Sequence, residues 1–378
     1  MADVLIYADS IRSPELRHEI PVPVTDPFLY AERNGRRVAV VTAFEMPRLR
    51  EGAPGLELIA PEQFGIDELL AGGMDRDEAD LEVCVRACRE LGVEEAAVPV
   101  TFPLALADRL RDNAIAVHPN RELFNERRRV KNEAELAGIV RAQRACEAGL
   151  DAARRLLRRA ERGDGELLLD GEPLTCERVK REVLDAFGEQ GAVGDELIVS
   201  HGPQTAIGHD MGSGVIAPDE PIVFDLFPRD RETGCYADMS RTYVVGTPPD
   251  DLVEWHGLCR VALERATAAV RVGVNGRELM ELVCDLFQEH GHPTQLSKRP
   301  GEVLEDGFYH ALGHGVGLEV HERPSMGRVG DDLVAGDVIA IEPGLYRNGW
   351  GGVRLENLVL VTDDGPEPLT QYPLDLAP

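Results

Sequence analysis

Lysine is almost missing from this sequence: Lys131, Lys180 and Lys298 are the only three among 40 cationic residues. Acidic residues number 68, which gives a formal net charge of −28 that no single acidic tail produces. Nucleic-acid binding needs a basic face for the phosphates, so we expect no DNA or RNA partner. A GC-rich genome would explain the excess of arginine over lysine but not the 68 acids. Because salt screens repulsion between like charges, we favour adaptation to a salt-rich cytoplasm.

Long apolar runs and C-x-x-C pairs are also missing. No run approaches the roughly 20 residues of a membrane span, and Met1–Val4 starts no signal peptide, so we expect a cytoplasmic protein without a membrane partner. The seven cysteines are scattered, which argues against a zinc ribbon or a disulfide framework. Cys84 and Cys88, four residues apart on an expected helix, suit packing on one helix face.

At 378 residues the chain is too long for one ordinary core, and two domains are expected, over residues 1–125 and 126–378. The first alternates β-rich runs with helical segments, which predicts a small α/β domain with strands at 37–42, 56–59, 96–100 and 115–117 and helices at 78–91 and 103–112. It holds no chemical motif, so its expected role is architectural or substrate-restricting. The basic cluster at 127–129 and a turn before it mark the predicted boundary.

The second domain is predicted to be richer in long helices. Helical patterns cover 132–162, 175–188, 251–271 and 276–290, with Thr175 as a candidate N-cap. Strands are expected at 196–200 and 221–227, and the chain closes with β-rich segments. The overall prediction is therefore a mixed α/β (α+β) protein.

Four acids and one histidine, each in or beside an apolar stretch, form the pattern that points to chemistry. The residues are Asp225, Asp238, His314, Glu342 and Glu356. Taken singly, each is more often a paired structural acid or a turn residue. Buried together they would be very costly unless cations compensate them, and two divalent ions supply four positive charges for four negative ones.

Spacing predicts that these acids meet in pairs. Asp225 and Asp238 are 13 residues apart (238 − 225) around the turn 229–234, and Glu342 and Glu356 are 14 apart (356 − 342) around glycine-rich turn residues. A hairpin returns its second arm alongside the first, so each pair should lie on adjacent antiparallel strands. Oxygen-rich ligation with one imidazole suits Mn²⁺, Co²⁺ or Fe²⁺ and tolerates Zn²⁺. Two such ions can activate water and polarise an amide carbonyl, which predicts hydrolysis.

This set of motifs resembles the pita-bread metallopeptidases, which include Xaa-Pro dipeptidases, aminopeptidase P and methionine aminopeptidases, with creatinase as a metal-free relative. The resemblance covers roughly residues 127–365 and is most specific at Gly313–Glu322, with the sequence GHGVGLEVHE. It implies a creatinase-like N-terminal domain and a pita-bread catalytic domain with an antiparallel sheet and flanking helices. It also implies a homodimer in which one subunit's N-terminal domain limits access to the other's active site.

The resemblance also implies roles for the site residues. Asp225 would bind one metal, Asp238 and Glu356 would bridge both, and His314 and Glu342 would hold the other, most readily with Mn²⁺ or Co²⁺. Glu342 would also accept a proton from the attacking water. His321 and His209 would contact the substrate, and Arg354 would pair with a ligand carboxylate. His201 and His310 match no family role and are expected to be structural or surface residues.

Two departures from the family pattern bear on the substrate. The first ligand is followed by Leu226-Phe227-Pro228 instead of the common Asp-x-Gly, and Asn357 follows Glu356 where Asp is frequent. The main hypothesis is a metal-dependent exopeptidase that cleaves an N-terminal Xaa-Pro bond in dipeptides or short peptides. Two alternatives stay open, namely a family member acting on a non-peptide amide and a metal-free pseudoenzyme that binds peptides.

Overall fold

The computed structural model describes residues 3–378, which divide into two compact units with the boundary between Arg128 and Arg129. The first unit is built on one six-stranded sheet in the order β4-β3-β2-β1-β5-β6. Strand β2 runs antiparallel to β1 and β3, whereas the β3–β4, β1–β5 and β5–β6 pairs are parallel.

The elements of the first unit are short. Its strands are β1 (Asp3–Ala8), β2 (Phe28–Arg33), β3 (Arg36–Val40), β4 (Glu57–Ile59), β5 (Glu95–Val98) and β6 (Ala116–Pro119). Its helices are α1 (Pro14–Glu19), α2 (Met46–Gly52), η1 (Pro61–Phe64), α3 (Ile66–Ala71), α4 (Arg76–Glu90), α5 (Leu104–Asp112) and α6 (Arg121–Arg129). Cys84 and Cys88 are both buried on α4, as expected. The segment before residue 127 was expected to be a turn but is the helix α6, which the Asn120 side chain helps to start by accepting a hydrogen bond from the Leu123 amide at 3.0 Å.

Alternate residues of this sheet face two apolar cores, as the two-residue period of a strand requires. Leu5, Leu29 and Val38 face a core shared with α4 and α5, whereas Ile6 and Tyr30 face a core shared with α1 and α2. Strands β1 and β2 were not predicted from the sequence.

The second unit has four long helices and several small sheets. The helices are α7 (Glu133–Arg159), α8 (Cys176–Glu189), α9 (Asp250–Ala269) and α10 (Gly276–Glu289), with a short helix η2 (Gly202–Ala206). The strands up to α9 are β7 (Glu161–Arg162), β8 (Leu167–Leu169), β9 (Glu172–Pro173), β10 (Ala192–Val193), β11 (Ile198–His201), β12 (Ile222–Leu226), β13 (Arg229–Asp230) and β14 (Met239–Tyr243). Those after α10 are β15 (Gly313–Gly315), β16 (Glu322–Met326), β17 (Val338–Ile341), β18 (Gly344–Arg347), β19 (Gly351–Arg354), β20 (Asn357–Thr362) and β21 (Gly365–Pro368).

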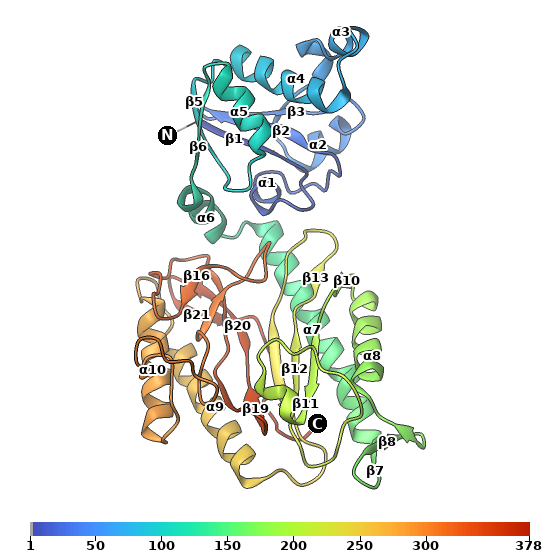
Figure 1. Ribbon diagram of the computed structural model, residues 1–378, viewed down its shortest axis with the longest axis vertical. Helices are drawn as coiled ribbons and strands as arrows, with labels where there is room; N and C mark the ends of the chain where they lie inside the picture. The colour runs from blue at the N-terminus through green and yellow to red at the C-terminus, as the bar shows by residue number, and fades with distance from the viewer. Residues whose placement is uncertain (1–2) are drawn as a thin grey trace. The chain divides into compact units, whose positions relative to one another are not determined.

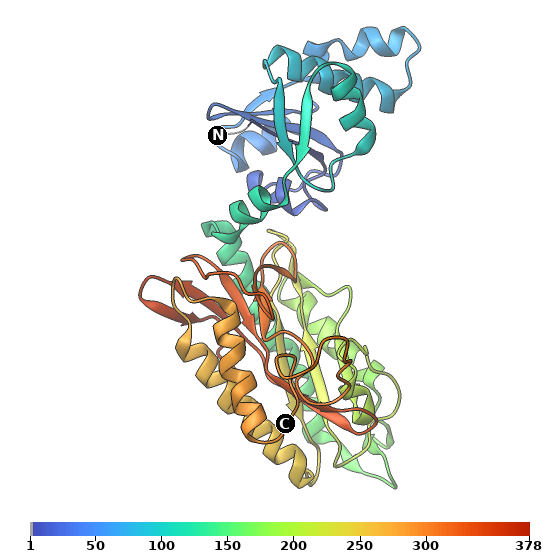
Figure 2. The same ribbon diagram turned by 60° about the vertical axis from the view of Figure 1, so that its left-hand side comes forward.

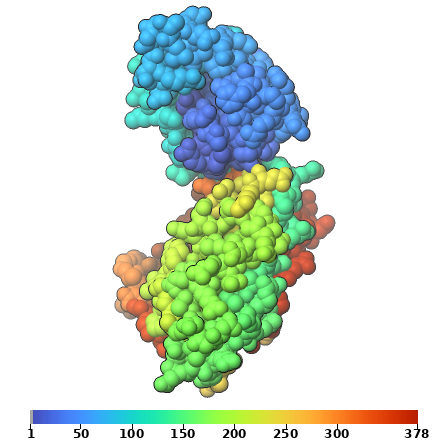
Figure 3. All heavy atoms as spheres, turned by 90° about the vertical axis from the view of Figure 1, so that its right-hand side faces the viewer, coloured from blue at the N-terminus to red at the C-terminus, as the bar shows by residue number. Residues whose placement is uncertain are grey.

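Helix ends in this unit follow local sequence rules. Asn132 caps α7 in a capping box with Glu135, and the Thr175 side chain accepts a hydrogen bond from the Arg178 amide at the start of α8. The helix pairs lie on opposite sides of the strands, with α7 and α8 (green) on one side and α9 and α10 (yellow to orange) on the other (Figures 1 and 2). Helix α8 and its neighbouring segments form much of the face of this unit seen in Figure 3.

Strands β17 and β20 lie between two apolar cores. Ala340 and Leu358 face the core of α7 and α8, whereas Ile339, Ile341 and Val359 face the core of α9 and α10. The sheet order β16-β15-β17-β20-β21 keeps these two strands adjacent, and a separate sheet has the order β11-β12-β14. The ends of β12, β14, β17 and β20 carry the predicted acids.

Candidate metal centre

The first two predicted acids come from a pair of antiparallel strands. Asp225 in β12 pairs in register with Ser240 of β14, which lies two residues after Asp238. Side chains two residues apart on an extended chain share a face, so Asp225 and Asp238 point to the same side. The antiparallel arrangement predicted from the turn between them is present.

The two glutamates meet in the same way. Strand β17 ends at Ile341, which pairs with Asn357 at the start of β20. Glu342 and Glu356 are the next residues on these two strands and therefore stand opposite each other, with the β18–β19 hairpin between them in sequence. The backbone amide of Glu356 donates a 3.0 Å hydrogen bond to the carbonyl of Ser240, which joins this pair to the first.

His314 brings a nitrogen donor to the acids. It lies on β15 opposite Ala340 of β17, and its Nδ1 is 3.1 Å from the carbonyl oxygen of Gly315. Its Nε2 is 3.7 Å from Asp238 Oδ2 and 3.6 Å from Glu342 Oε1. Asp238, His314 and Glu356 offer ligand atoms that all lie within 4.8 Å of one another.

Two of the acids are buried and the other two are partly buried beside them, and this changes their proton affinity. Asp238 is 4% exposed and Glu356 is 1% exposed. Burial, followed by repulsion from neighbouring carboxylates, raises the pKa of Asp238 and Glu342 well above the usual range and that of Glu356 to about 8. Burial, followed by the nearby His321, lowers the pKa of His314 to about 4, so this imidazole is neutral at pH 7 with a lone pair available.

Donors of the chain itself satisfy only part of this cluster. Arg354 donates from Nη2 to Asp225 Oδ2 at 2.6 Å and from Nε to the Ser240 hydroxyl oxygen at 3.1 Å. The Ser240 oxygen is also 3.0 Å from Asp225 Oδ1 and 2.8 Å from Glu356 Oε2. Burial alone would lower the pKa of Arg354, but the surrounding acids, Asp225 first, raise it well above normal and keep the guanidinium charged.

The donor set fits metal ions. Asp238 Oδ1 is buried and has no hydrogen-bond partner among the described residues. One guanidinium cannot neutralise four carboxylates, and a neutral imidazole adds a nitrogen donor to an oxygen-rich set of the kind that Mn²⁺, Co²⁺ and Fe²⁺ favour. Cations bound between these atoms would satisfy the buried oxygen and keep the acids ionised.

The two histidines predicted to contact substrate lie at the edge of the cluster. His321 is exposed and its ring centroid is 4.3 Å from that of His314, edge to face. Burial of part of the ring, then His209, lowers the pKa of His321. His209 is exposed in the segment after η2 and lies near enough to influence the pKa of both His310 and His321.

His310 is a site residue that the sequence interpretation missed. Its Nδ1 is 3.8 Å from Glu342 Oε2, and its Nε2 is 2.9 Å from the hydroxyl oxygen of Tyr346. Burial, reinforced by the Arg354 charge, lowers the pKa of His310 to about 3. The segment around His310 has no regular period, so only its position four residues before His314 could have drawn attention to it. His201, by contrast, lies 2.5 Å from Glu220 and takes no part in the cluster.

Arg241 donates hydrogen bonds to the backbone that carries the cluster, and the sequence interpretation missed it as well. It is fully buried, and its Nη1 donates to the carbonyl oxygens of Ser240 at 2.8 Å and Glu356 at 2.6 Å. Its Nη2 donates to Asn357 Oδ1 at 2.9 Å. The Asn357 that departs from the family pattern is therefore a neutral partner for a buried cation.

More than half of the chain is similar to a known protein family. Residues 137–363 match the sequence model of metallopeptidase family M24. The Xaa-Pro dipeptidase of Pyrococcus furiosus is 33% identical over 183 residues, 48% of this chain and 49% of that protein, so the alignment spans about half of that relative's length. The Xaa-Pro dipeptidase of Pyrococcus horikoshii is 27% identical over 289 residues, 75% of each chain.

A solved structure shares the fold along the whole chain. The Xaa-Pro dipeptidase from Bacillus anthracis superposes with a TM-score of 0.78 at 24% identity, covering 100% of this chain and 94% of that one. The predicted combination of a mixed α/β unit and a pita-bread unit is confirmed. Within residues 3–378, every helix is too short or too polar to cross a membrane.

Proposed function

Since the chain belongs to metallopeptidase family M24, we propose that it is a dinuclear metal-dependent Xaa-Pro dipeptidase, which hydrolyses the bond between an N-terminal residue and proline. The proteins named above as its relatives are Xaa-Pro dipeptidases, which supports the dipeptide over longer peptides as the preferred substrate. As a member of a metallopeptidase family it is a hydrolase, and the proposal adds the substrate and the number of metal ions.

One observation carries the proposal: four carboxylates and a neutral imidazole converge from separate strands, and one buried oxygen among them has no hydrogen-bond partner among residues 3–378. A peptide-binding pseudoenzyme has no use for such a cluster, because burying it costs stability unless cations are bound. The proposed ligands are Asp225, Asp238, His314, Glu342 and Glu356. Two divalent ions held there would supply a water of lowered pKa and polarise the substrate carbonyl.

The remaining residues of the site have proposed roles in binding and proton transfer. Glu342, which faces both His310 and His314, accepts the proton of the attacking water at a carboxylate oxygen. His321 and His209, exposed at the edge of the cluster, donate hydrogen bonds to the substrate carbonyl oxygen as negative charge develops on it. Arg354 fixes Oδ2 of Asp225 through its 2.6 Å hydrogen bond and so orients that carboxylate within the cluster.

The assembly and setting of the protein are further parts of the proposal. We expect a cytoplasmic homodimer in which the N-terminal unit of one subunit limits access to the active site of the other and so excludes folded proteins. Residues 3–128 contain no group of three or more described His, Cys, Asp or Glu residues arranged to hold a metal, which is consistent with a role in access instead of chemistry.

The decisive experiment compares three peptides with the purified protein supplied with Mn²⁺ or Co²⁺. Hydrolysis of Ala-Pro faster than Ala-Pro-Ala and Ala-Ala, abolished by a chelator and restored by metal, would support the proposal. Preference for Ala-Pro-Ala would make the protein an aminopeptidase P. Failure to cleave any of the three, at two bound metal ions per chain, would overturn the proposed substrate class.

A further inference from the structure

The segment that carries His321 has little regular structure of its own. Residues 316–321 connect β15 to β16, and Gly315 pairs with Glu322 where the two strands meet. The beginning of the segment is held by backbone hydrogen bonds from the Val316 amide to the Val338 carbonyl at 2.9 Å and from the Tyr236 amide to the Gly317 carbonyl at 2.7 Å. The end that carries His321 is held by a hydrogen bond between His314 and the Val320 backbone and by the pairing of Glu322 with Gly315, and the Glu322 side chain adds a further contact.

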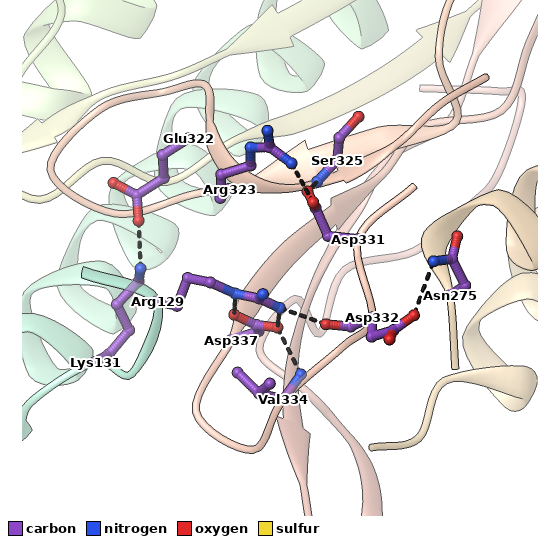
Figure 4. Close-up of polar contacts among 10 residues, drawn as sticks. All are labelled: Arg129, Lys131, Asn275, Glu322, Arg323, Ser325, Asp331, Asp332, Val334 and Asp337. Atoms are coloured by element: carbon purple, nitrogen blue, oxygen red, sulfur yellow. Dashed lines mark hydrogen bonds and ion pairs between the residues drawn. The ribbon is translucent and has the colours of Figure 1, made fainter. Parts of the chain in front are cut away.

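The Glu322 side chain folds back beneath this segment. A Cβ atom added at Gly317 would lie 2.6 Å from Glu322 Oε1 and 3.0 Å from Oε2, so the carboxylate fills the space where residue 317 would place a side chain. The Glu322 side chain is 4% exposed and forms an ion pair with Lys131, whose side chain is 3% exposed (Figure 4). The Glu322 carboxylate therefore contacts the segment near its start, at Gly317, while the Glu322 backbone directly follows its end at His321.

Lys131 is itself held firmly at the start of α7. It directly precedes the capping box formed by Asn132 and Glu135, and its amide donates a 3.3 Å hydrogen bond to the Gly336 carbonyl. Two residues earlier, Arg129 makes a bidentate pair with the buried Asp337 at 2.7 and 3.0 Å and donates to the Asp332 carbonyl at 2.6 Å (Figure 4). These contacts fix the backbone that carries the Lys131 side chain. Its partner Glu322 lies 191 residues away in sequence.

Stability alone does not explain an ion pair in this position. A well-packed apolar pair of similar volume often stabilises a fold as well as a buried ion pair does, because it avoids the loss of hydration. An apolar pair, however, lacks the directional hydrogen bond by which Lys131 fixes the Glu322 carboxylate against Gly317. We propose that Lys131 and Glu322 are positioning residues that hold segment 316–321, and with it His321, in the orientation the active site needs.

The consequence for catalysis rests on the proposed function, but the ordering of the segment does not. We therefore suggest two readouts: hydrogen–deuterium exchange of residues 316–322 in the metal-free protein, and kcat and KM for Ala-Pro at saturating Mn²⁺. The central variant is the double substitution Lys131→Met with Glu322→Met, which removes both charges and leaves neither unpaired. Gly317→Ala is an independent variant that displaces the carboxylate while keeping both charged groups.

Both variants should loosen the segment without unfolding the protein. We expect exchange of residues 316–322 to rise by about tenfold or more, while kcat falls by about 10- to 100-fold with a smaller change in KM. The single variant Lys131→Arg keeps a cation opposite Glu322, so its kcat should lie between those of the double variant and the wild type. The double substitution Arg141→Met with Asp230→Asn is the matched control: it removes both charges of another ion pair, made by α7 at 2.9 Å and outside this segment, and should leave exchange of 316–322 unchanged.

The outcomes separate the two proposals. Unchanged exchange of 316–322 in both the double variant and Gly317→Ala would show that the pair is only structural and would overturn the inference. The inference is also overturned if the wild type is active and exchange rises in the two variants, but their kcat stays at the wild-type value. If the wild-type protein cleaves no Xaa-Pro peptide, the proposed function fails, and the exchange of 316–322 still decides whether this ion pair orders the segment.

Discussion

The two units of the chain carry the same density of negative charge but bury it differently. By count, residues 1–128 hold 24 acids and 15 cations (24 − 15, net −9), and residues 129–378 hold 44 and 25 (44 − 25, net −19). In the first unit the buried Asp9 accepts hydrogen bonds from the Ile11 and Arg12 amides and from the Arg12 guanidinium. In the second, the buried Asp238 has an oxygen with no partner among the described residues and three other acids around it.

The difference shows that net charge alone does not mark a functional site in this protein. What distinguishes the second unit is a cluster of acids in which one buried oxygen, Oδ1 of Asp238, has no hydrogen-bond partner among residues 3–378. Such an arrangement lowers stability unless something else binds there, and selection retains it when the bound group is useful.

Removing the proposed bridging acids should make the second unit resemble the first. The double variant Asp238→Ala with Glu356→Ala should lose both metal ions and lower kcat/KM by more than about a hundredfold, because ligands matter more than the residues that support them. Elemental analysis and Ala-Pro hydrolysis provide the measurements. Glu232→Ala, which removes an exposed acid in the turn between the first two ligands, is the control and should keep its metal. Full occupancy in the double variant would contradict the ligand assignment.

The edge histidines should affect turnover without affecting metal. His321→Ala and His209→Ala should each lower kcat by about 10²- to 10³-fold, since they are proposed to donate to an oxygen that gains negative charge. Metal content should stay close to that of the wild type. An exposed histidine of the first unit provides the control, and His118→Ala should change neither quantity. Loss of metal in step with activity would instead make His321 a ligand.

A buried polar group without an acid cluster should behave differently, and His256 provides this comparison. It lies on α9, its Nε2 has no partner among residues 3–378, and burial followed by Arg260 lowers its pKa from 6.5 to about 4. The unfolded chain therefore binds a proton at a higher pH than the native protein, so stability falls as pH drops from about 6.5 to about 4. Compared with His256→Gln, the wild type should lose about 2–3 kcal/mol more over this range in urea unfolding. Parallel pH dependences for the two proteins would contradict the assignment.

Salt should act on both units alike, because their charge densities match. Screening between low salt and molar KCl should raise the melting temperature by about 2–4 °C for each kcal/mol of repulsion removed, as the Debye length falls to about 3 Å. Calorimetry should show the shift in both units if they unfold separately. A melting temperature that stays flat or falls would rule out adaptation to high salt.

Patterns local in sequence were the parts of the fold that could be predicted. Helix α10 was expected at 276–290 and lies at Gly276–Glu289, and Thr175 caps α8 as expected, because capping and periodicity act over a few residues. The meeting of Asp225 with Asp238 followed from a single turn. By contrast, the contact of His310 with Glu342 depends on an irregular segment, and the Lys131–Glu322 pair joins residues 191 apart. No local rule reports such contacts, because tertiary packing alone creates them.

The strands β17 and β20 have a practical consequence for anyone who engineers this protein. They contribute alternate residues to two different cores and end at Glu342 and Glu356. A larger side chain at Ala340 or Ile339 would overpack one of the two cores and displace β17, which both cores share. The displacement of β17 and its neighbour β20 would shift Glu342 and Glu356. Stabilising substitutions are therefore better placed on the outward faces of α8 and α10, where a change of volume leaves that shared wall undisturbed.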